Sequence, residues 1–377
     1  MKNVPPLHLL IKPASDGCNM ACRYCFYRDE AENRQVPSYG RMSEETLETV
    51  VRRAFDYAER ECTFAFQGGE PTLAGLPFFR KLVELVKQYN TKKIRVHYAI
   101  QTNGYVIDRE WAEFFRENRF LVGLSLDGNK EVHDRFRPDR TGKGTFSKAM
   151  HAAQLFDACG VDYNILTVVT KQLAQNIQKV YSFYARNGFR FQQYIPCLDA
   201  IGEERGGQEY SLTPEVYGKF LIELFELWYR DRKQGKQVSI RYFDNLLMVL
   251  RDTPPEACGM LGCCSVQNVV EADGEVYPCD FYVLDRYRLG NLKELDLAQI
   301  HENRKQSGFL QSSLVKPEEC QTCRWKSLCR GGCRRDRDQF DGGDPGLNYF
   351  CKAYQQFFDA AFPRLRELAY TNINRLF

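Results

Sequence analysis

Short apolar runs alternate with amphipathic stretches along the first half of the chain. The apolar, β-prone runs predict strands, and apolar residues that recur every three to four positions predict helices. Strands are expected at residues 7–12, 63–66, 94–100, 120–126, 162–169 and 189–195. Helices are expected at residues 43–59, 77–89, 108–118, 146–159 and 173–187. Ser43 is a favourable N-cap for the first of these helices because its hydroxyl can accept a backbone N–H.

This alternation predicts an α/β fold with a parallel sheet, because repeated strand–helix units connect through right-handed crossovers. The six units are fewer than the eight of a closed barrel. Four loops that follow or close predicted strands carry glycine, polar or cysteine residues; they are residues 18–25, 68–71, 101–104 and 125–128. Ligands bind at the carboxyl ends of parallel strands, so we expect these loops to meet at one rim and form a site.

The pattern changes after the sixth unit. A charged loop that contains glycine covers residues 202–208, and an amphipathic helix is expected at 214–232, followed by a helix at 242–250. These elements predict a bridge between two halves of the chain. The cysteine content also changes after about residue 250, because nine of the fifteen cysteines lie between Cys258 and Cys351.

Composition excludes several classes of protein. The chain has 377 residues, of which 44% are hydrophobic and 27% are charged, which is ordinary for a globular protein. A formal charge of +3 gives no electrostatic reason to expect nucleic acid or a membrane surface as a partner. No apolar run is long enough to span a bilayer, and the first residues lack the apolar core of a signal peptide. We therefore expect a cytoplasmic protein whose thiols stay reduced.

Fifteen cysteines are an odd number, so disulfides alone cannot account for them. Cys18, Cys22 and Cys25 have the spacing C-x3-C-x2-C. Three thiolates on one short loop can hold three corners of an iron–sulfur cluster and leave the fourth position open for a ligand. The alternative is a zinc site completed by a distant His or Cys.

With Tyr24 before its third cysteine, this motif resembles that of the radical S-adenosylmethionine (radical SAM) superfamily. Gly68-Gly69-Glu70-Pro71 matches the GGEP motif of the superfamily. The resemblance implies that the open iron binds S-adenosylmethionine and that reduction yields a 5′-deoxyadenosyl radical. It also implies which residues contact the cofactor. Gly68, Gly69 and Glu70 would hold the methionine amino group. Ser125 and Arg137 would contact the ribose and the carboxylate, and Gln101 and Leu198 would line the adenosine. Turn formation, surface exposure and loop packing are the structural alternatives for these residues.

The carboxyl-terminal cysteines resemble those of the SPASM extension found in some radical SAM enzymes. The array is Cys264-x9-Gly274-x4-Cys279, then Cys320-x2-Cys323-x5-Cys329-x3-Cys333, then Cys351. The resemblance implies two auxiliary clusters and therefore three [4Fe-4S] clusters in all. One auxiliary cluster would take Cys258, Cys264, Cys279 and Cys333, and the other would take Cys320, Cys323, Cys329 and Cys351. Cys263 fits the spacing almost as well as Cys264, and a pair of zinc ribbons is the alternative for the array.

Longer stretches resemble the anaerobic sulfatase-maturating enzymes over nearly the whole chain. They include residues 10–18, 25–27, 64–73, 239–244, 276–282 and 331–335. The resemblance implies a partial (β/α)6 radical SAM barrel with a bridging helix at residues 1–235 and a SPASM domain at 236–377. It implies oxidation of a Cys or Ser of a sulfatase to Cα-formylglycine, with Asp280 as the base and with Tyr27 and Gln67 near the substrate. The structural alternatives are backbone hydrogen bonding for Asp280 and packing for Tyr27 and Gln67.

The same resemblance implies the partners. They are an unfolded or nascent sulfatase segment of the form Cys/Ser-x-Pro/Ala-x-Arg and an electron donor such as flavodoxin or ferredoxin. A second interpretation is another SPASM enzyme that forms thioethers or crosslinks in peptides. The 17 residues before Cys18 leave little room for the leader-binding domain that such enzymes often carry. A zinc-ribbon scaffold without enzymatic activity is the interpretation from a different class.

Overall fold

The computed structural model describes residues 5–340, 343 and 345–371. Within it the chain forms two compact units built from interleaved segments. Unit 1 comprises residues 1–125, 137–163 and 266–309, and unit 2 comprises residues 126–136, 164–265 and 310–377. Because these segments interleave, the expected domain boundary at residue 235 does not coincide with the packing units and stays a prediction.

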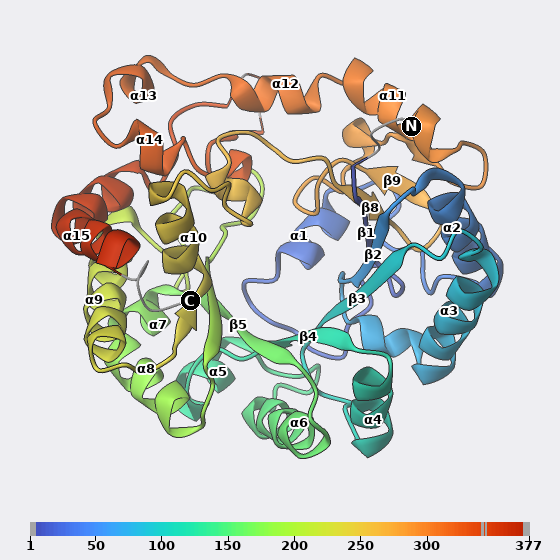
Figure 1. Ribbon diagram of the computed structural model, residues 1–377, viewed down its shortest axis with the longest axis horizontal. Helices are drawn as coiled ribbons and strands as arrows, with labels where there is room; N and C mark the ends of the chain where they lie inside the picture. Colours follow the sequence, from blue (N-terminus) through green and yellow to red (C-terminus); the bar gives the residue numbers. More distant parts are fainter. Residues whose placement is uncertain (1–4, 341–342, 344, 372–377) are drawn as a thin grey trace. The chain divides into compact units, whose positions relative to one another are not determined.

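Unit 1 is organised around a sheet whose central strands are parallel. The strands β1 (Leu7–Ile11), β2 (Glu61–Phe66), β3 (Arg95–Thr102) and β4 (Phe120–Ser125) pair in chain order. On the other side of β1 lies β8 (Asn268–Val270), also parallel, followed by the antiparallel strands β9 (Glu275–Tyr277) and β10 (Gly290–Asn291). Figure 1 shows β8 beside β1, although more than 250 residues separate them in sequence. A carboxyl-terminal segment is thus built into the sheet of the amino-terminal half.

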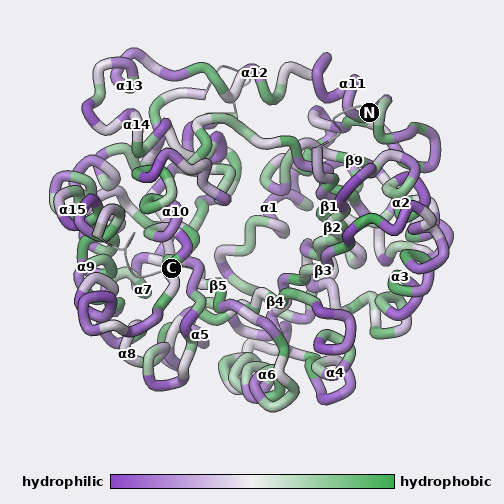
Figure 2. Tube along the Cα trace, in the orientation of Figure 1, coloured by the Kyte–Doolittle hydropathy of each residue, from purple (hydrophilic) through white to green (hydrophobic). Residues whose placement is uncertain are grey.

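The helices of unit 1 pack on the sheet and on one another. They are α1 (Phe26–Glu32), α2 (Glu44–Tyr57), α3 (Leu76–Tyr89), α4 (Arg109–Glu117), α6 (Phe146–Cys159) and α11 (Leu297–Gln306). Among them, α4 and α6 contact β4, and α2 packs on α3 and α11. Hydropathy alternates along α2 and α3 in Figure 2, as expected for helices buried along one stripe. Phe66, Phe79 and Phe120 are fully or almost fully buried and form an aromatic core under α3, which contributes on the order of 2 kcal/mol per side chain.

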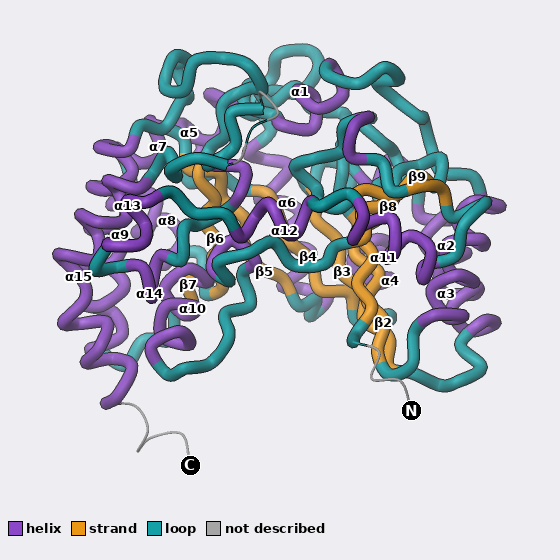
Figure 3. The backbone as a smooth tube through the Cα atoms, turned by 90° about the horizontal axis from the view of Figure 1, so that it is seen from above, coloured by secondary structure: helices purple, strands orange, loops and turns teal. Residues whose placement is uncertain are grey.

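Unit 2 contains most of β5 (Tyr163–Val169), which pairs with β6 (Phe191–Pro196), and β6 pairs with the short β7 (Ser239–Ile240). Its helices are α5 (Lys130–Phe136), α7 (Lys171–Gln175), α8 (Ile177–Arg186), α9 (Pro214–Lys233), α10 (Arg241–Leu250), α12 (Phe309–Leu314), α13 (Glu318–Thr322), α14 (Lys326–Cys329) and α15 (Cys351–Thr371). The long helices α9 and α15 pack together around Phe225, Phe243 and Phe357. Loops make up most of the chain between α12 and α15 (Figure 3).

The predicted pattern of elements is confirmed, with one helix divided. The six expected strands are β1 to β6, and Ser43 caps α2 by accepting the Thr46 N–H at 3.1 Å. The expected helix at 173–187 is two helices, because Asn176 interrupts it and its side chain donates to Gln172 O at 2.9 Å. Asn favours such local hydrogen bonds over helix continuation. No helix within the described residues is long and apolar enough to cross a membrane.

Candidate active site and metal centres

The first three cysteines lie on a loop between β1 and α1 of unit 1. Cys25 is the N-cap residue of α1, and the cysteine loop is fixed to a second segment through Ala21 N, which donates to Pro138 O at 2.9 Å. Burial and the nearby Glu70 carboxylate raise the pKa of the Cys18 thiol to about 11. A metal must therefore displace the proton before this thiol ligates, which is the usual coupling of metal binding to thiol ionisation.

Loops after β2 and β3 lie directly against the cysteine loop. Gly69 N donates to Ser15 O at 2.9 Å, and Glu70 N donates to Gly17 O at 2.8 Å. Asn103, which follows β3, donates from Nδ2 to Asn19 Oδ1 at 2.9 Å and to Cys18 Sγ at 3.7 Å. These contacts bring together three of the loops that the sequence places at the carboxyl ends of strands.

Glu70 organises this rim from inside the protein. Its side chain is 1% exposed, and its Oε2 accepts the Asn103 N–H at 2.7 Å. Its Oε1 accepts hydrogen bonds from Thr72 N, Thr72 Oγ1 and Thr102 Oγ1. The carboxylate thus ties the loop after β2 to the loop after β3. A contact of Glu70 with the methionine amino group stays a prediction, and the structure adds that this residue positions the backbone around it.

The other expected cofactor contacts fall into two groups. Gln101 donates to Ser125 Oγ at 3.0 Å, and Arg137 donates to Tyr24 Oη at 2.9 Å, so each pair joins two segments of unit 1. Arg137 and Tyr24 are both nearly buried, which disfavours the interpretation of Arg137 as an ordinary surface residue. Leu198 lies in unit 2, in the loop that follows β6. Their roles toward the cofactor stay predictions.

Asp280, Tyr27 and Gln67 form a hydrogen-bonded triangle in unit 1. Tyr27 Oη donates to Asp280 Oδ2 at 2.7 Å. Gln67 Nε2 lies 3.2 Å from the same oxygen and 2.9 Å from Tyr27 Oη. The loop after β9, the start of α1 and the end of β2 supply these residues, which lie far apart in sequence. The three side chains expected near the substrate therefore meet at one point.

The second oxygen of Asp280 is the chemically available one. Asp280 is 9% exposed, and its Oδ1 is buried without a hydrogen-bond partner among the described residues. Burial raises the pKa of Asp280, and the positive charge of Lys12 opposes that rise. A buried carboxylate oxygen with no donor is unfavourable unless a ligand supplies one. An acidic hydrogen of a substrate would satisfy it, and the raised pKa makes this carboxylate a better proton acceptor near neutral pH.

Near Asp280 is a buried cluster of charged residues that could not be predicted from the sequence. Lys12 Nζ lies 3.5 Å from Glu271 Oε2 and 3.9 Å from Glu30 Oε2, and Arg34 Nη1 lies 2.6 Å from Glu271 Oε2. Burial raises the pKa of Glu30 to about 8 against the opposing charge of Lys12. Burial also acts on Glu271, but Lys12 and Arg34 together hold its pKa below the usual range. Glu30 is therefore the protonated and Glu271 the ionised partner at neutral pH.

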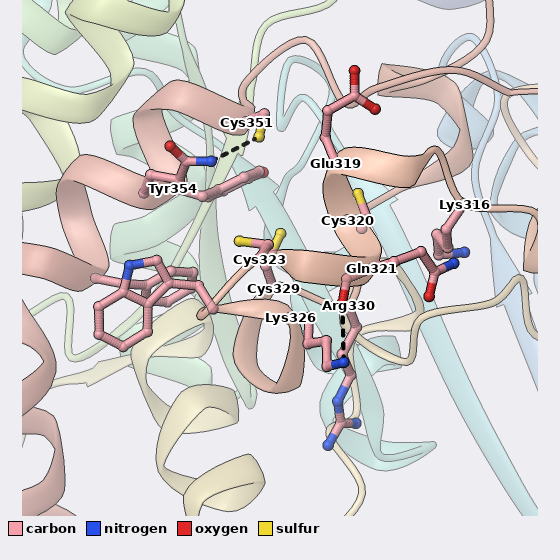
Figure 4. Close-up of a pocket in the computed structure, with 14 residues that line it drawn as sticks. Lys316, Glu319, Cys320, Gln321, Cys323, Lys326, Cys329, Arg330, Cys351 and Tyr354 are labelled. Carbon is pink, nitrogen blue, oxygen red and sulfur yellow. Dashed lines mark hydrogen bonds between the residues drawn. The ribbon is translucent and has the colours of Figure 1, made fainter.

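Four cysteines of unit 2 line one cavity. Cys320, Cys323, Cys329 and Cys351 surround a space of about 200 Å³, and Figure 4 shows their sulfur atoms around it. A single bound water needs only about 10–15 Å³ measured in this way, so the cavity suits a polyatomic cluster better than a single ion. Lys316 lies at the wall, and Gln355 Nε2 donates to Cys351 Sγ at 3.5 Å. The thiolates of this set match the ligands that iron–sulfur clusters use.

The other predicted auxiliary ligands divide between the units. Within unit 2, Gly259 packs on Cys333, since a Cβ built on this glycine would lie 3.4 Å from Cys333 Cβ. Burial raises the pKa of Cys333, and the thiols of Cys258 and Cys264 raise it further. Cys264 is near enough to Cys333 for its thiol to act on that pKa, and its N–H donates to Ser313 Oγ at 2.9 Å. The choice between Cys264 and Cys263 as the ligand stays a prediction. Cys279 belongs to unit 1, so its place in this ligand set stays a prediction.

Two family models match the chain. Residues 13–184 match the radical SAM superfamily, and residues 262–324 match SPASM, an iron–sulfur cluster-binding domain. The fold is accordingly a radical SAM domain with a SPASM domain, as expected from the cysteine motifs. Both domains bind iron–sulfur clusters, and the first uses S-adenosylmethionine.

Relatives of known function resemble the chain over nearly its full length. A cysteine-type anaerobic sulfatase-maturating enzyme of Clostridium perfringens is 51% identical over 97% of this chain and 99% of its own length. Another from Clostridium novyi is 48% identical, with 97% and 98% of the two chains covered. A solved structure of native anSMEcpe with bound AdoMet and the Cp18Cys peptide is 50% identical, covers 97% of this chain and 99% of that chain, and has a TM-score of 0.94.

Proposed function

The chain belongs to the anaerobic sulfatase-maturating enzymes within the radical SAM superfamily, and on that premise we propose how its own residues perform the oxidation of a sulfatase cysteine to Cα-formylglycine. Cysteine is the proposed substrate residue because both relatives are of the cysteine type. The observation that carries the proposal is the buried Oδ1 of Asp280, which has no donor among the described residues.

We assign Cys18, Cys22 and Cys25 to the cluster that binds S-adenosylmethionine. Gly68, Gly69 and Glu70 face the methionine end, Ser125 and Arg137 the ribose and carboxylate, and Gln101, Leu198 and Tyr24 complete the surroundings. When bound, this cluster and S-adenosylmethionine supply a 5′-deoxyadenosyl radical, which removes one hydrogen atom from the substrate Cβ. The loop contacts of Gly69, Glu70 and Asn103 hold the cysteine loop in place for that chemistry.

Asp280 accepts the thiol proton of the substrate at Oδ1. Tyr27 and Gln67 donate to Oδ2, which keeps the carboxylate oriented and leaves Oδ1 directed to the substrate. Lys12 favours the ionised form of Asp280 and so keeps it ready to act as a base. General-base catalysis of this kind contributes about 10²–10⁴-fold to a rate.

The balance of the reaction determines what the rest of the chain must provide. Loss of one hydrogen atom from Cβ, one proton from sulfur and one further electron converts the thiol into a thioaldehyde, and water then replaces sulfur to give the aldehyde and hydrogen sulfide. We propose that Cys258, Cys264, Cys279 and Cys333 would hold an auxiliary cluster, which would supply an acceptor for the further electron. Cys279 is next to Asp280 in sequence. The cavity lined by Cys320, Cys323, Cys329 and Cys351 would hold the second auxiliary cluster, which makes three [4Fe-4S] clusters in all.

The remaining parts of the proposal concern organisation and partners. Residues 1–235 form the radical SAM part with its bridging helix, and residues 236–377 form the SPASM part. The substrate is an unfolded or nascent sulfatase segment, and a flavodoxin- or ferredoxin-like protein supplies electrons. We place the reaction in the cytoplasm, with neither nucleic acid nor membrane as a partner.

The experiment that tests this function uses two peptides that differ in one atom. The reduced, anaerobically reconstituted protein is incubated with S-adenosylmethionine and with a Cys-x-Pro-x-Arg peptide or its serine counterpart. Mass spectrometry should show the formylglycine aldehyde together with 5′-deoxyadenosine, and the cysteine peptide should react faster. A crosslinked or thioether product without aldehyde would instead identify the chain as a different SPASM peptide-modifying enzyme.

A further inference from the structure

Lys316 lies in unit 2 between the two groups of cysteines that are proposed to hold the auxiliary clusters. It lines the four-cysteine cavity, and Figure 4 shows it on the side of that cavity where Cys320 lies. Its aliphatic stem packs on Gly331, since a Cβ built on this glycine would lie 2.8 Å from Lys316 Cε. In sequence, Gly331 falls between Cys329 of the cavity and Cys333 of the other group. The lysine side chain thus contacts the segment that joins both groups.

Hydrogen bonds to Ser313 connect Lys316 with the second cysteine group. Lys316 Nζ donates to Ser313 O at 2.7 Å, and the Ser313 hydroxyl accepts the Cys264 N–H at 2.9 Å. Arg337 donates from Nη2 to the same Ser313 carbonyl at 2.7 Å and from Nη1 to Val315 O at 2.7 Å. Arg337 is 1% exposed, so its charge is held in the interior close to the ammonium group. One serine therefore fixes two cations next to the backbone of Cys264.

The charges of these two side chains act on cysteines of both groups. Burial lowers the pKa of Lys316, and the guanidinium of Arg337 lowers it further. The thiolates of Cys320, Cys263 and Cys264 raise that pKa, so all three lie close to the ammonium group. Burial raises the pKa of both Cys264 and Cys320, and Arg337 opposes the rise at each. The two cations therefore face both groups, whichever of Cys263 and Cys264 is the ligand.

We propose that Lys316 and Arg337 form a cationic bridge between the two auxiliary cluster sites and raise the reduction potential of both clusters. The proposal rests on the proposed function, because that function places clusters in these two cysteine groups and requires an acceptor for the further electron. A [4Fe-4S] cluster held by four thiolates carries net negative charge, and reduction adds one more. Nearby cations therefore stabilise the reduced form more than the oxidised form. Lys316 and Arg337 are thus positioning residues, which make the clusters better electron acceptors without contact with the substrate.

The test is an anaerobic redox titration of the holoenzyme without substrate, monitored by electron paramagnetic resonance. S-adenosylmethionine changes the signal of the cluster that binds it, so the two remaining couples belong to the auxiliary clusters. In Lys316→Met, the ratio of reduced to oxidised cluster at a fixed potential should fall by about tenfold for both auxiliary couples, which equals about 59 mV for one electron. Lys316→Arg keeps the charge, and its ratios should stay within about twofold of those of the wild type.

Further variants separate charge from structure. Lys316→Gln is a second neutral variant, because its amide can still donate to Ser313 O. Lys326 also lines the four-cysteine cavity, but it is exposed and donates to Gln321 O at 3.0 Å, so Lys326→Met should leave the couple of the other auxiliary cluster unchanged. Lys179 is exposed on α8 and does not line the cavity, so Lys179→Met should change neither couple. Iron and sulfide content is measured for every variant to show that the clusters are present.

The outcomes distinguish the bridge from the proposed function. Auxiliary couples that keep their wild-type potentials in both neutral variants of Lys316, or a shift confined to one couple, would overturn the bridge. Turnover gives a second measurement, because a weaker electron acceptor leaves more hydrogen-atom removals without an aldehyde. The amount of 5′-deoxyadenosine formed per formylglycine should therefore rise in Lys316→Met and stay at the wild-type value in Lys316→Arg. Failure of the wild type to form aldehyde would contradict the proposed function, and the potentials measured without substrate would still decide the inference.

Discussion

The buried carboxyl groups of Glu30 and Glu271 differ in protonation because the Lys12 ammonium group lies closer to Glu271 than to Glu30. Arg34 adds a second positive charge beside Glu271 alone at hydrogen-bond distance. Two carboxyls beside one cation cannot both ionise cheaply in a buried site. The buried cluster of charged residues thus contains one ionised and one neutral carboxyl near Asp280, and its charge state determines the field that the proposed base experiences.

Two matched substitutions test this assignment through stability at neutral pH. Glu271→Gln leaves Lys12 and Arg34 without their ionised partner and should lower the free energy of unfolding by about 3–5 kcal/mol. Glu30→Gln replaces a group that is neutral in the folded protein but ionised in the unfolded chain at pH 7, so it should raise the free energy of unfolding and not lower it. Thermal unfolding of the anaerobic holoenzymes at pH 7 measures the difference. Equal losses in the two variants would show that both carboxyls are ionised.

The pH dependence of Glu30 follows from the same comparison. Its pKa in the folded protein is about 8, above the value of about 4.5 for an unperturbed Glu, so the folded state binds the proton more tightly than the unfolded state. This contribution to stability is complete below about pH 4.5, falls as the pH rises between the two pKa values, and is lost once the pH has passed about 8. The wild type should therefore lose more thermal stability between pH 5 and pH 8 than Glu30→Gln does. Parallel pH profiles of the two proteins would contradict the raised pKa.

The role of Asp280 as the base is tested by a substitution that removes its charge and keeps the shape of the side chain. Asp280→Asn keeps the acceptor toward Tyr27 and Gln67 but cannot take a proton, so formylglycine formation should fall by about 10² or more. Iron and sulfide content should stay at the wild-type level. Tyr27→Phe is the companion variant, because it removes one donor to Oδ2 and leaves the base in place. Near-wild-type turnover of Asp280→Asn would exclude its role as the base.

At the scale of elements, loops after three neighbouring strands form the rim of unit 1 through backbone contacts. The loop after β2 approaches the cysteine loop so closely that only glycine fits at one position. A Cβ on Gly69 would lie 2.2 Å from Gly17 O and 2.6 Å from Asp16 O. Because Gly17 precedes Cys18 directly, any displacement here moves the predicted cluster ligands.

Gly69→Ala should therefore disrupt the first cluster and not the fold. We expect loss of about four irons per chain and of S-adenosylmethionine cleavage, with the circular dichroism of the wild type retained. Gly346→Ala is the control, since a Cβ there would lie 3.8 Å from Arg337 O, an ordinary contact. Full iron content and normal 5′-deoxyadenosine formation in Gly69→Ala would show that the two loops are not coupled.

Much of this arrangement could be predicted from the sequence, and the reasons are specific. Periodicity located β1 to β6 because each is a short apolar run bounded by polar or glycine residues, and Ser43 marked the start of α2. The motif spacings identified the loops of Cys18 and Gly69. The buried cluster of Lys12, Glu30 and Glu271 could not be predicted, because a charged residue beside an apolar run gives no sign of its distant partner. The strand β8 was missed for the same reason, since its pairing with β1 is a long-range contact.

At the scale of the whole molecule, the fifteen cysteines separate by environment. Four predicted ligands line one cavity of unit 2, three lie on the loop after β1, and Cys62 and Cys197 are buried as core side chains. If eleven cysteines hold three clusters, the holoenzyme contains about twelve irons and about twelve sulfides per chain. Cys329→Ala should lower both by about four and retain cleavage of S-adenosylmethionine. About two to three zinc atoms without sulfide would identify a zinc-ribbon protein instead.

The central claim is that the enzyme takes a hydrogen atom from Cβ of a sulfatase cysteine and leaves an aldehyde there. The most direct measurement uses a substrate peptide whose reactive cysteine carries deuterium at both Cβ positions. Mass spectrometry should find one deuterium transferred to 5′-deoxyadenosine and one retained in the formylglycine product, in equal amounts. Unlabelled 5′-deoxyadenosine, or deuterated 5′-deoxyadenosine without any aldehyde, would contradict the claim.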